Sequence, residues 1–277
     1  MSKGFLIYAQ NSGKTDYIEQ AYALALSIKH SQSDIKNVSL VTNSKVSDEY
    51  KSIFDNIIAV PWSKETSGLH AEHRWQVYYA TPYDETIVLD SDMLFFEDIA
   101  TWWDYCGNYD IKFCSRIKNY KLEHVIDAFH RKTFVSNNLT SPYYALHYFK
   151  KNQSAFEFYK VLEFVCNNWE YCWNLFAPID KQNSVSMDLA AAIAIEICGI
   201  QDSAVDSKNP LEFIHMKTPL QGWEIFPQSW KDTVPYTLNN RGELFVGNIR
   251  QTKLFHYVEK DFITSSILNK LKALCNG

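Results

Sequence analysis

Short apolar runs alternate with helix-like segments over the first hundred residues of the sequence. Runs rich in apolar and β-branched residues predict strands at 5–9, 38–42, 57–60 and 86–90. Between them, apolar residues spaced three and four apart predict helices at 17–28, 47–54 and about 70–80. Strands that alternate with helices favour a mostly parallel α/β sheet, in which ligands bind beyond the carboxyl ends of the strands.

The pattern is looser after residue 97, and it favours a mixed α+β arrangement. We expect strands at 110–115, 143–149, 211–216, 244–246 and 254–258. We expect helices at 99–105, 153–166, 186–198 and 262–275, the third of them ended by Gly199. Residues 116–140 are polar and poorly periodic. Because no repeat or flexible linker interrupts the 277 residues, we predict one domain over 1–277.

Composition and charge limit the classes of protein to which this sequence can belong. The content of 46% hydrophobic and 21% charged residues is ordinary for a soluble globular protein. A net charge of −5 without a basic stripe argues against a nucleic-acid partner. The first apolar run is too short for a signal peptide, and no run approaches the length of a membrane span. Six cysteines without a C-x-x-C pair or zinc spacing predict reduced thiols and a cytoplasmic location.

Two carboxylates follow the predicted strand at 86–90. Asp90 and Asp92 stand one residue apart between two apolar runs, so both should be partly buried. Buried paired carboxylates repel each other and lose hydration, and a cation relieves both costs. Oxygen ligands at a strand end suit Mg²⁺ or Mn²⁺ carrying a phosphate group. The same D-x-D pattern also fits an ordinary acidic turn.

The first strand, loop and helix resemble the opening of a nucleotide site. The loop at 10–14 has a single glycine, so it is not a phosphate-binding Gly-rich loop. A nucleotide here would contact the end of the strand at Ala9, the amide of Asn11 and the ring of Tyr17. Tyr17 would equally serve to pack the first turn of the helix.

The residues around the acidic turn resemble the core of GT-A-fold glycosyltransferases, closest to the glycogenin and lipopolysaccharide galactosyltransferase type. The resemblance rests on Arg74-Trp75-x-x-Tyr78-x-x-Thr81-Pro82-Tyr83-Asp84, followed by Ile87-Val88-Leu89-Asp90-Ser91-Asp92-Met93. It is good over residues 1–100 and patchy beyond. It implies a nucleotide-sugar donor, usually a UDP-sugar, bound by residues 1–100, and an acceptor half over 101–277. It also implies a divalent metal, usually Mn²⁺, and places Arg74 and Ser91 near the sugar nucleotide.

The resemblance further implies a third metal ligand near the C-terminus, followed by a lysine. His256 and Lys260 match this pair, although the usual Gly and Pro-Trp of that motif are missing and Lys260 lies closer to the histidine. Asp90, Asp92 and His256 would then form a donor set that suits Mn²⁺, or Mg²⁺. A half-buried strand histidine bonded to backbone would give the same sequence.

One acid opens the apolar helix at 186–198. Asp188 must point into something polar, which is a cleft, a partner or the helix N-terminus itself. The resemblance gives this residue contact with the donor sugar, so we take Asp188 and Arg74 as catalytic candidates. His215 and Trp223 are weaker candidates for the acceptor side, and packing roles would explain both.

These residues predict a metal-dependent transfer of a sugar from a nucleoside diphosphate sugar to an acceptor hydroxyl on a glycan, retaining in the resembled type. A nucleotidyltransferase of related fold is the second enzymatic interpretation, and the single glycine of the loop counts against it. A non-catalytic sugar- or nucleotide-binding module is the third. Transfer to modified DNA bases is disfavoured by the negative charge.

Overall fold

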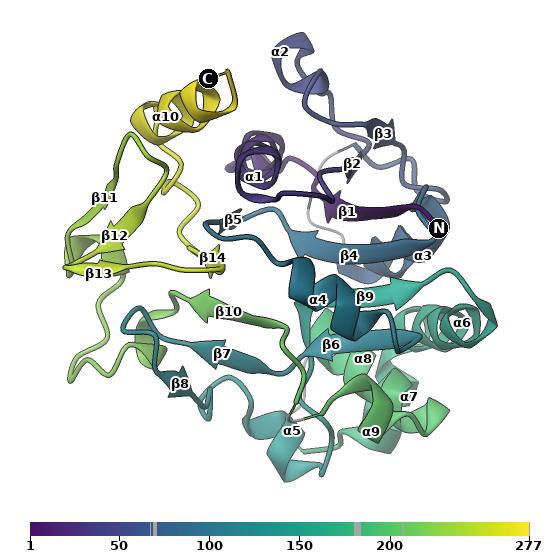
Figure 1. The fold of residues 1–277 in the computed structure, drawn as a ribbon. Helices are drawn as coiled ribbons and strands as arrows, with labels where there is room; N and C mark the ends of the chain where they lie inside the picture. The colour runs from purple at the N-terminus through teal and green to yellow at the C-terminus, as the bar shows by residue number, and fades with distance from the viewer. Residues whose placement is uncertain (67, 69–70, 180–183, 207, 277) are drawn as a thin grey trace.

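A six-stranded sheet forms the centre of the molecule (Figure 1). The computed structural model describes residues 1–66, 68, 71–179, 184–206 and 208–276. In order across the sheet, the strands are β3 (Asn56–Ile58), β2 (Val38–Val41), β1 (Lys3–Tyr8), β4 (Glu85–Asp90), β9 (Tyr143–Lys150) and β6 (Ile111–Cys114). Among the described strands of this sheet, β9 alone runs opposite to the others. The predicted mostly parallel α/β sheet is confirmed.

Helices cover both faces of this sheet, because its central strands are apolar on both sides. Phe5 and Ile7 of β1 pack with α1 (Tyr17–Ser31) and α4 (Ala100–Cys106) in one core. Leu6 and Tyr8 pack in a second core with α6 (Gln153–Asn167), α7 (Trp169–Phe176) and α8 (Met187–Cys198). Side chains alternate between the two faces of a strand, so one apolar run serves both cores.

A second sheet lies beside the carboxyl ends of the central strands. Its order is β5 (Met93–Phe95), β14 (Leu254–His256), β10 (Glu212–His215), β7 (Arg116–Lys118) and β8 (His124–Val125). A small antiparallel sheet follows, with β11 (Tyr236–Leu238), β12 (Leu244–Val246) and β13 (Ile249–Arg250). Residues from both halves of the sequence build the first two sheets, because β9 pairs with β4 and β14 pairs with β5.

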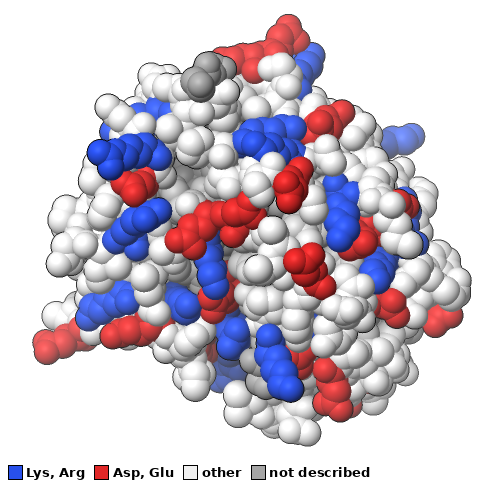
Figure 2. Space-filling model, viewed as in Figure 1, with Lys and Arg blue, Asp and Glu red and all other residues white. Residues whose placement is uncertain are grey.

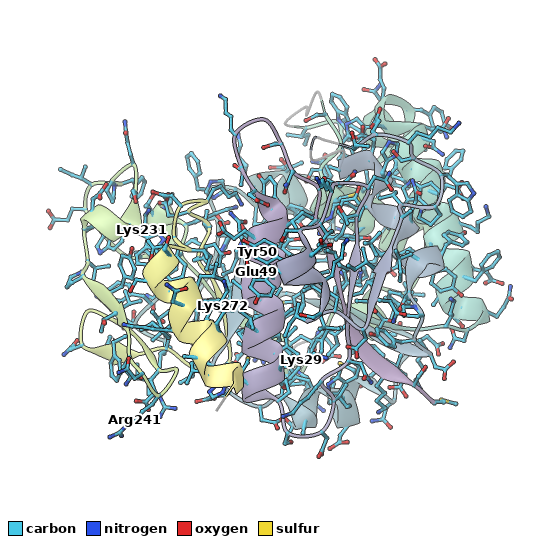
Figure 3. The ribbon with its side chains drawn as sticks, turned by 90° about the horizontal axis from the view of Figure 1, so that it is seen from above. Lys29, Glu49, Tyr50, Lys231, Arg241 and Lys272 are labelled. Carbon is cyan, nitrogen blue, oxygen red and sulfur yellow. The ribbon has the colours of Figure 1, made fainter. Side chains whose placement is uncertain are left out.

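The C-terminal helix α10 (Ser265–Asn276) packs against α1. Lys272 of α10 forms an ion pair with Glu49 of α2 (Asp48–Lys51), and the two lie close to Tyr50 in Figure 3. Tyr50 in turn stacks on Tyr22 of α1, with ring centroids 4.3 Å apart. These contacts hold the end of the chain against its first helix.

Several predicted boundaries moved for local reasons. The predicted helix at about 70–80 is a 3₁₀ helix, η1 (Ala71–Gln76), continued by α3 (Val77–Ala80), and residue 70 lies outside the described part. Both helix types place residues i and i+3 on one face, so spacing does not distinguish them. The last helix begins at Ser265 rather than 262, because the Thr264 hydroxyl accepts from the Ile267 N–H and Phe262 packs in the core.

Other elements had no signal in the sequence pattern. The interval 116–140 contains β7, β8 and α5 (Lys132–Ser136). The remaining short elements are α9 (Gln201–Ala204), η2 (Thr218–Leu220) and η3 (Trp230–Asp232). Across the described residues, no helix combines the length and apolar character needed to cross a bilayer. Figure 2 shows acidic and basic side chains interspersed over the face that it displays.

Candidate functional site

The register of the central sheet places two chain segments at one edge. In the parallel pair of β1 and β4, Tyr8 lies beside Asp90, and both strands end there. Ala9 and Gln10 continue from β1, and Ser91 and Asp92 continue from β4. Residues distant in the sequence therefore meet beyond the carboxyl ends of adjacent parallel strands, where ligands bind in sheets of this kind.

The second sheet brings the histidines to the same edge. β14 pairs antiparallel with β5, which sets His256 beside Met93, directly after Asp92. β14 also pairs with β10, which sets His215 beside His256. The two imidazole rings stack with centroids 4.7 Å apart and planes inclined by 14°. The Nε2 of His256 lies 3.1 Å from the Oδ2 of Asp92.

Asp90, Asp92 and His256 form a candidate metal site. One ligand atom from each residue lies within 4.8 Å of the others. Two carboxylate oxygens and an imidazole nitrogen suit Mn²⁺, and Mg²⁺ prefers the carboxylate part of this set. Asp92 is buried, and a buried carboxylate needs positive charge close to it. The residues present therefore fit a divalent cation.

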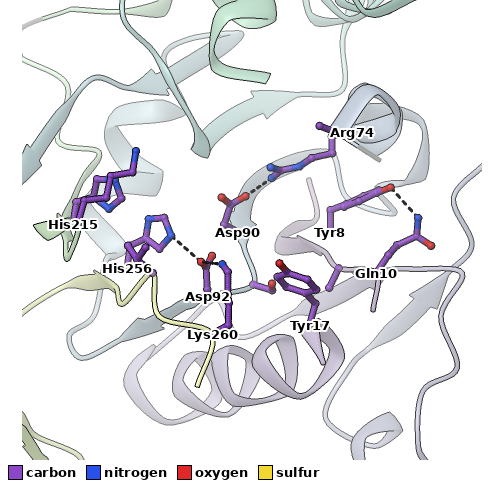
Figure 4. Close-up of a pocket in the computed structure, with 14 residues that line it drawn as sticks. Tyr8, Gln10, Tyr17, Arg74, Asp90, Asp92, His215, His256 and Lys260 are labelled. Atoms are coloured by element: carbon purple, nitrogen blue, oxygen red, sulfur yellow. Dashed lines mark hydrogen bonds and ion pairs between the residues drawn. The ribbon is translucent and has the colours of Figure 1, made fainter. Parts of the chain in front are cut away.

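Two basic side chains neutralise the carboxylates (Figure 4). Arg74 forms an ion pair with Asp90, and the Lys260 ammonium bonds to Oδ2 of Asp92. Burial raises the pKa of Asp92, but His256 and Lys260 lower it by more, so its pKa lies well below the ordinary value. Burial lowers the pKa of Arg74, and Asp90 more than restores it. The site is thus charged and internally paired.

Aromatic rings hold Arg74 in place. Its guanidinium lies 5.1 Å from the ring centroid of Tyr144 and 5.9 Å from that of Tyr8. The hydroxyl of Tyr144 donates to the backbone carbonyl of Arg74 at 3.0 Å. The Nε of Arg74 is buried without a hydrogen-bond partner among the described residues.

A cavity of about 350 Å³ surrounds the candidate metal site. In Figure 4, Tyr8, Gln10 and Tyr17 lie on one side of Asp92, and His215 lies on the other. The lining residues are Tyr8, Ala9, Gln10, Tyr17, Ala71, Arg74, Asp90, Ser91, Asp92, His215, Lys217, His256, Val258 and Lys260. Eight residues named from the sequence as nucleotide or metal contacts are in this set: Ala9, Tyr17, Arg74, Asp90, Ser91, Asp92, His256 and Lys260.

Asn11 lies outside the cavity lining. Its Oδ1 accepts from the Ile18 N–H at 3.0 Å, and its own N–H donates to Ser44 Oγ at 2.8 Å. The side chain therefore fixes the loop against the start of α1. Tyr17, in contrast, both packs in the core of α1 and lines the cavity, where Lys260 Nζ lies 5.3 Å from its ring centroid.

Asp188 also lies outside the cavity lining. Its Oδ2 accepts from Arg131 at 2.7 Å, and its Oδ1 accepts from the Tyr144 N–H at 2.8 Å. The N-cap of α8 is Ser186, so the alternative role of Asp188 as that cap is not the observed one. Trp223 packs near Tyr120, with ring centroids 6.0 Å apart, and does not line the cavity.

Five lining residues were not singled out from the sequence. Three of them lie within two residues of a candidate named from the sequence: Tyr8 and Gln10 flank Ala9, and Lys217 follows His215 by two positions. Ala71 and Val258 carry no chemistry that would mark them. Val258 has a φ of 66°, in the left-handed region that a β-branched residue rarely adopts.

No protein-family model and no curated protein sequence matches the chain. Among solved structures, the galactosyltransferase LgtC in complex with donor and acceptor sugar analogs is similar, with a TM-score of 0.53 and 12% identity over 99% of this chain and 95% of that one. The apo form of mouse xyloside xylosyltransferase 1 is similar with a TM-score of 0.46 and 10% identity, over 70% of this chain and 82% of that one.

The glycosyltransferase GlyE of Streptococcus pneumoniae TIGR4 is similar with a TM-score of 0.42 and 12% identity over 76% of this chain. This chain spans about half of the length of GlyE, 47%. The comparison with LgtC covers nearly all of both chains. The chain has the GT-A fold of glycosyltransferases.

Proposed function

We propose that the protein is a metal-dependent glycosyltransferase that moves a sugar from a nucleoside diphosphate sugar, a UDP-sugar, to an acceptor hydroxyl on a glycan. One observation carries the proposal. Asp90, Asp92 and His256 converge in a cavity beyond the ends of the parallel strands, with Arg74 and Lys260 beside them. This is the charge arrangement that a metal-bound diphosphate requires.

The residues at the β1 end of the cavity would hold the nucleotide. Ala9 and Tyr17 line this end, and Asn11 fixes the loop between them. The ring of Tyr17 offers an apolar surface for the base or ribose. We assign the donor to residues 1–100 together with His256 and Lys260, and the acceptor to the remainder of 101–277.

The centre of the cavity would hold the metal and the diphosphate. Asp90, Asp92 and His256 would bind Mn²⁺ or Mg²⁺, which supplies Lewis-acid stabilisation of the charge on the leaving diphosphate. The Lys260 side chain is 42% exposed, so it is able to leave Asp92 for a phosphate oxygen. Arg74 and the Ser91 backbone would contact the same group.

The opposite end of the cavity would hold the transferred sugar. Asp188, oriented by Arg131 and the Tyr144 N–H, would accept hydrogen bonds from sugar hydroxyls. We propose retention of the anomeric configuration, in line with the glycogenin-like sequence features. All six cysteines are free thiols, and the cytoplasmic location stays a prediction of the sequence.

Ligand binding tests this function directly. Thermal unfolding would be followed with UDP, GDP and CDP, each with Mn²⁺ and with EDTA. We expect UDP to raise the melting temperature, and Mn²⁺ to enlarge that rise. The absence of metal-dependent stabilisation by all three nucleotides would refute the proposal. Mass spectrometry of the protein incubated with a mixture of nucleotide sugars would then identify the donor that is hydrolysed.

A further inference from the structure

Lys217 contributes an ammonium group to the lining of the cavity. It follows the last residue of β10, His215, by two positions, and both residues line the cavity. His215 stacks on the metal-site residue His256, and Figure 4 shows it on the far side of His256 from Tyr8. Two residues of extended chain cover about 7 Å, so Lys217 lies just beyond the candidate metal site.

The ammonium group has hydrogen-bonding capacity to spare. The Lys217 side chain is 34% exposed, and its Nζ makes no hydrogen bond to the described residues. An ammonium group has three N–H donors. Burial lowers the pKa of Lys217, and Asp127 and Asp188 oppose this effect. A group that is partly desolvated and unbonded gains most from a ligand oxygen.

A buried carboxylate lies behind this lysine. The Asp127 side chain is fully buried, and its Oδ1 accepts from both the N–H and the Nδ1 of His130 at 2.9 Å. Its Oδ2 has no hydrogen-bond partner among the described residues and lies 3.9 Å from Lys217 Nζ. Asp127 therefore attracts the ammonium to this position without occupying its N–H groups.

The neighbouring charges compensate one another. Arg131 and Asp188 pair at 2.7 Å, and Lys217 faces Asp127, so two basic groups match two acidic ones. An additional carboxylate on the ligand would gain little in such neutral surroundings, because Asp188 and Asp127 already balance the charges of Arg131 and Lys217. A hydroxyl group, which accepts from the lysine without adding charge, suits the surroundings better.

We propose that Lys217, positioned by Asp127, donates a hydrogen bond to a hydroxyl of the transferred sugar and so selects a neutral hexose donor. The inference rests on the proposed function, because it requires a nucleotide sugar in this cavity. The transferred sugar is the relevant ligand because it is attached directly to the diphosphate, and Lys217 lies directly beyond the metal site in the same cavity.

Calorimetric titration in Mn²⁺ tests the proposal without relying on turnover. Wild type and Lys217→Met would be titrated with UDP, UDP-glucose, UDP-galactose, UDP-N-acetylglucosamine and UDP-glucuronate. We expect Lys217→Met to weaken the tightest-binding UDP-hexose about ten- to a hundredfold, the value of a hydrogen bond from a charged donor. UDP itself should bind equally to both proteins. Lys217→Arg, which keeps a charged donor, should recover part of the loss.

Two further lysine-to-methionine variants serve as controls for the titration. Lys260→Met should weaken UDP and the UDP-hexose alike, whereas Lys45→Met, at an exposed position, should change neither. Equal affinities of wild type and Lys217→Met for the UDP-hexose would overturn the inference while leaving the proposed function intact. Tighter binding of UDP-glucuronate than of the hexoses by wild type would also overturn it. If wild type binds none of the nucleotides, the proposed function fails and this inference falls with it.

The positioning role of Asp127 is tested by a double-mutant cycle. Asp127→Asn keeps an acceptor for His130 but removes the charge that faces Lys217. It should weaken the UDP-hexose and spare UDP, and it should cause no further loss in the Lys217→Met background. Additive losses in the double variant would show that Asp127 acts independently of Lys217.

Discussion

The Nε2 of His256 lies 3.1 Å from the Oδ2 of Asp92 because two three-residue strands pair. Antiparallel β5 and β14 set His256 opposite Met93, and the Tyr257 N–H donates to the Asp92 carbonyl at 3.2 Å. The backbone therefore fixes both side chains from opposite ends of the sequence. The candidate metal site therefore forms only when β5 and β14 pair in the folded protein.

Asp92→Asn should remove most of the metal dependence of nucleotide binding. Loss of an outer partner of a metal ligand typically costs about 10–100-fold in affinity, so loss of a direct ligand should cost at least about tenfold. Titration of UDP with and without Mn²⁺ measures the effect as the ratio of the two affinities. Asp104→Asn, at an exposed position on α4, is the matched control and should keep the wild-type ratio. An unchanged ratio in Asp92→Asn would remove this carboxylate from the metal site.

Lys260→Met should weaken recognition of the diphosphate. The Lys260 ammonium bonds to Asp92, and its exposed side chain is free to move to a phosphate oxygen. We expect the affinity for UDP in Mn²⁺ to fall about tenfold, as for loss of one charge-assisted hydrogen bond. The gain in affinity from UMP to UDP should shrink as well. An undiminished gain would assign Lys260 to holding Asp92 alone.

The sequence was sufficient to predict the central sheet and the residues at its edge. The apolar run before Asp90 and the alternation of strands and helices are local signals, and the sheet that they predict is observed. The cavity lining includes Asp90, Asp92, His256 and Lys260, all of which were named from motifs. Asp90 and Asp92 were predicted because they directly follow a strong strand signal, whereas His256 and Lys260 were named only because the family resemblance implies them.

Only part of the second sheet could be predicted from the sequence, because several of its strands are very short. β5, β7 and β8 have three, three and two residues, and strands this short are stabilised by their neighbours rather than by local propensity. Lys217 and Asp127 likewise come together only in the fold, from the segment after β10 and from the polar interval 116–140. Asn11 was expected from the sequence to contact a nucleotide. In the structure its side chain accepts from the Ile18 N–H at the start of α1.

Hydrolysis of the donor should release the sugar with its anomeric configuration retained. Inversion needs a base on the face of the sugar opposite to the leaving group. Among the described residues that line the cavity, the carboxylates Asp90 and Asp92 and the imidazole of His256 belong to the candidate metal site. Burial lowers the pKa of the remaining imidazole, His215, and so makes it a weak base. An acceptor proton would therefore pass to the departing phosphate on the same face. Proton NMR of the released sugar, recorded before mutarotation, distinguishes the two outcomes, and an inverted product would contradict this prediction.

The free energy of unfolding should decrease as the pH is lowered below 6.5, because His147 is buried in its neutral form. This residue is fully buried, its Nδ1–H donates to the Tyr144 carbonyl at 2.8 Å, and its Nε2 accepts from Tyr159 at 2.9 Å. Burial is the main cause that lowers its pKa to about 3 from the ordinary value of 6.5. Between these two values the unfolded chain binds a proton that the folded chain does not. The free energy of unfolding should therefore fall by up to about 1.4 kcal/mol per pH unit from this residue.

His147→Gln isolates that contribution. Urea unfolding of wild type and variant at pH 7, 6 and 5 gives the difference between their free energies of unfolding, in which the other titrating groups cancel. We expect the variant to be the less stable protein at pH 7 and the gap to narrow as the pH falls. Parallel pH profiles would show that His147 is protonated in the folded state.

Gly4→Ala should destabilise the central sheet, because the ring of Tyr83 lies directly over this glycine. A Cβ on Gly4 would overlap the Tyr83 ring, whose hydroxyl is held 2.7 Å from Ser39 Oγ. Gly4 pairs with Thr86 in the register of β1 and β4, so neither the backbone nor the ring has room to shift. Overpacking of this kind costs about 1–3 kcal/mol in the free energy of unfolding. Gly13→Ala, where a Cβ would meet no atom within 4 Å, should leave the urea midpoint unchanged. Equal midpoints for the two variants would mean that Tyr83 does not pack on β1 in solution.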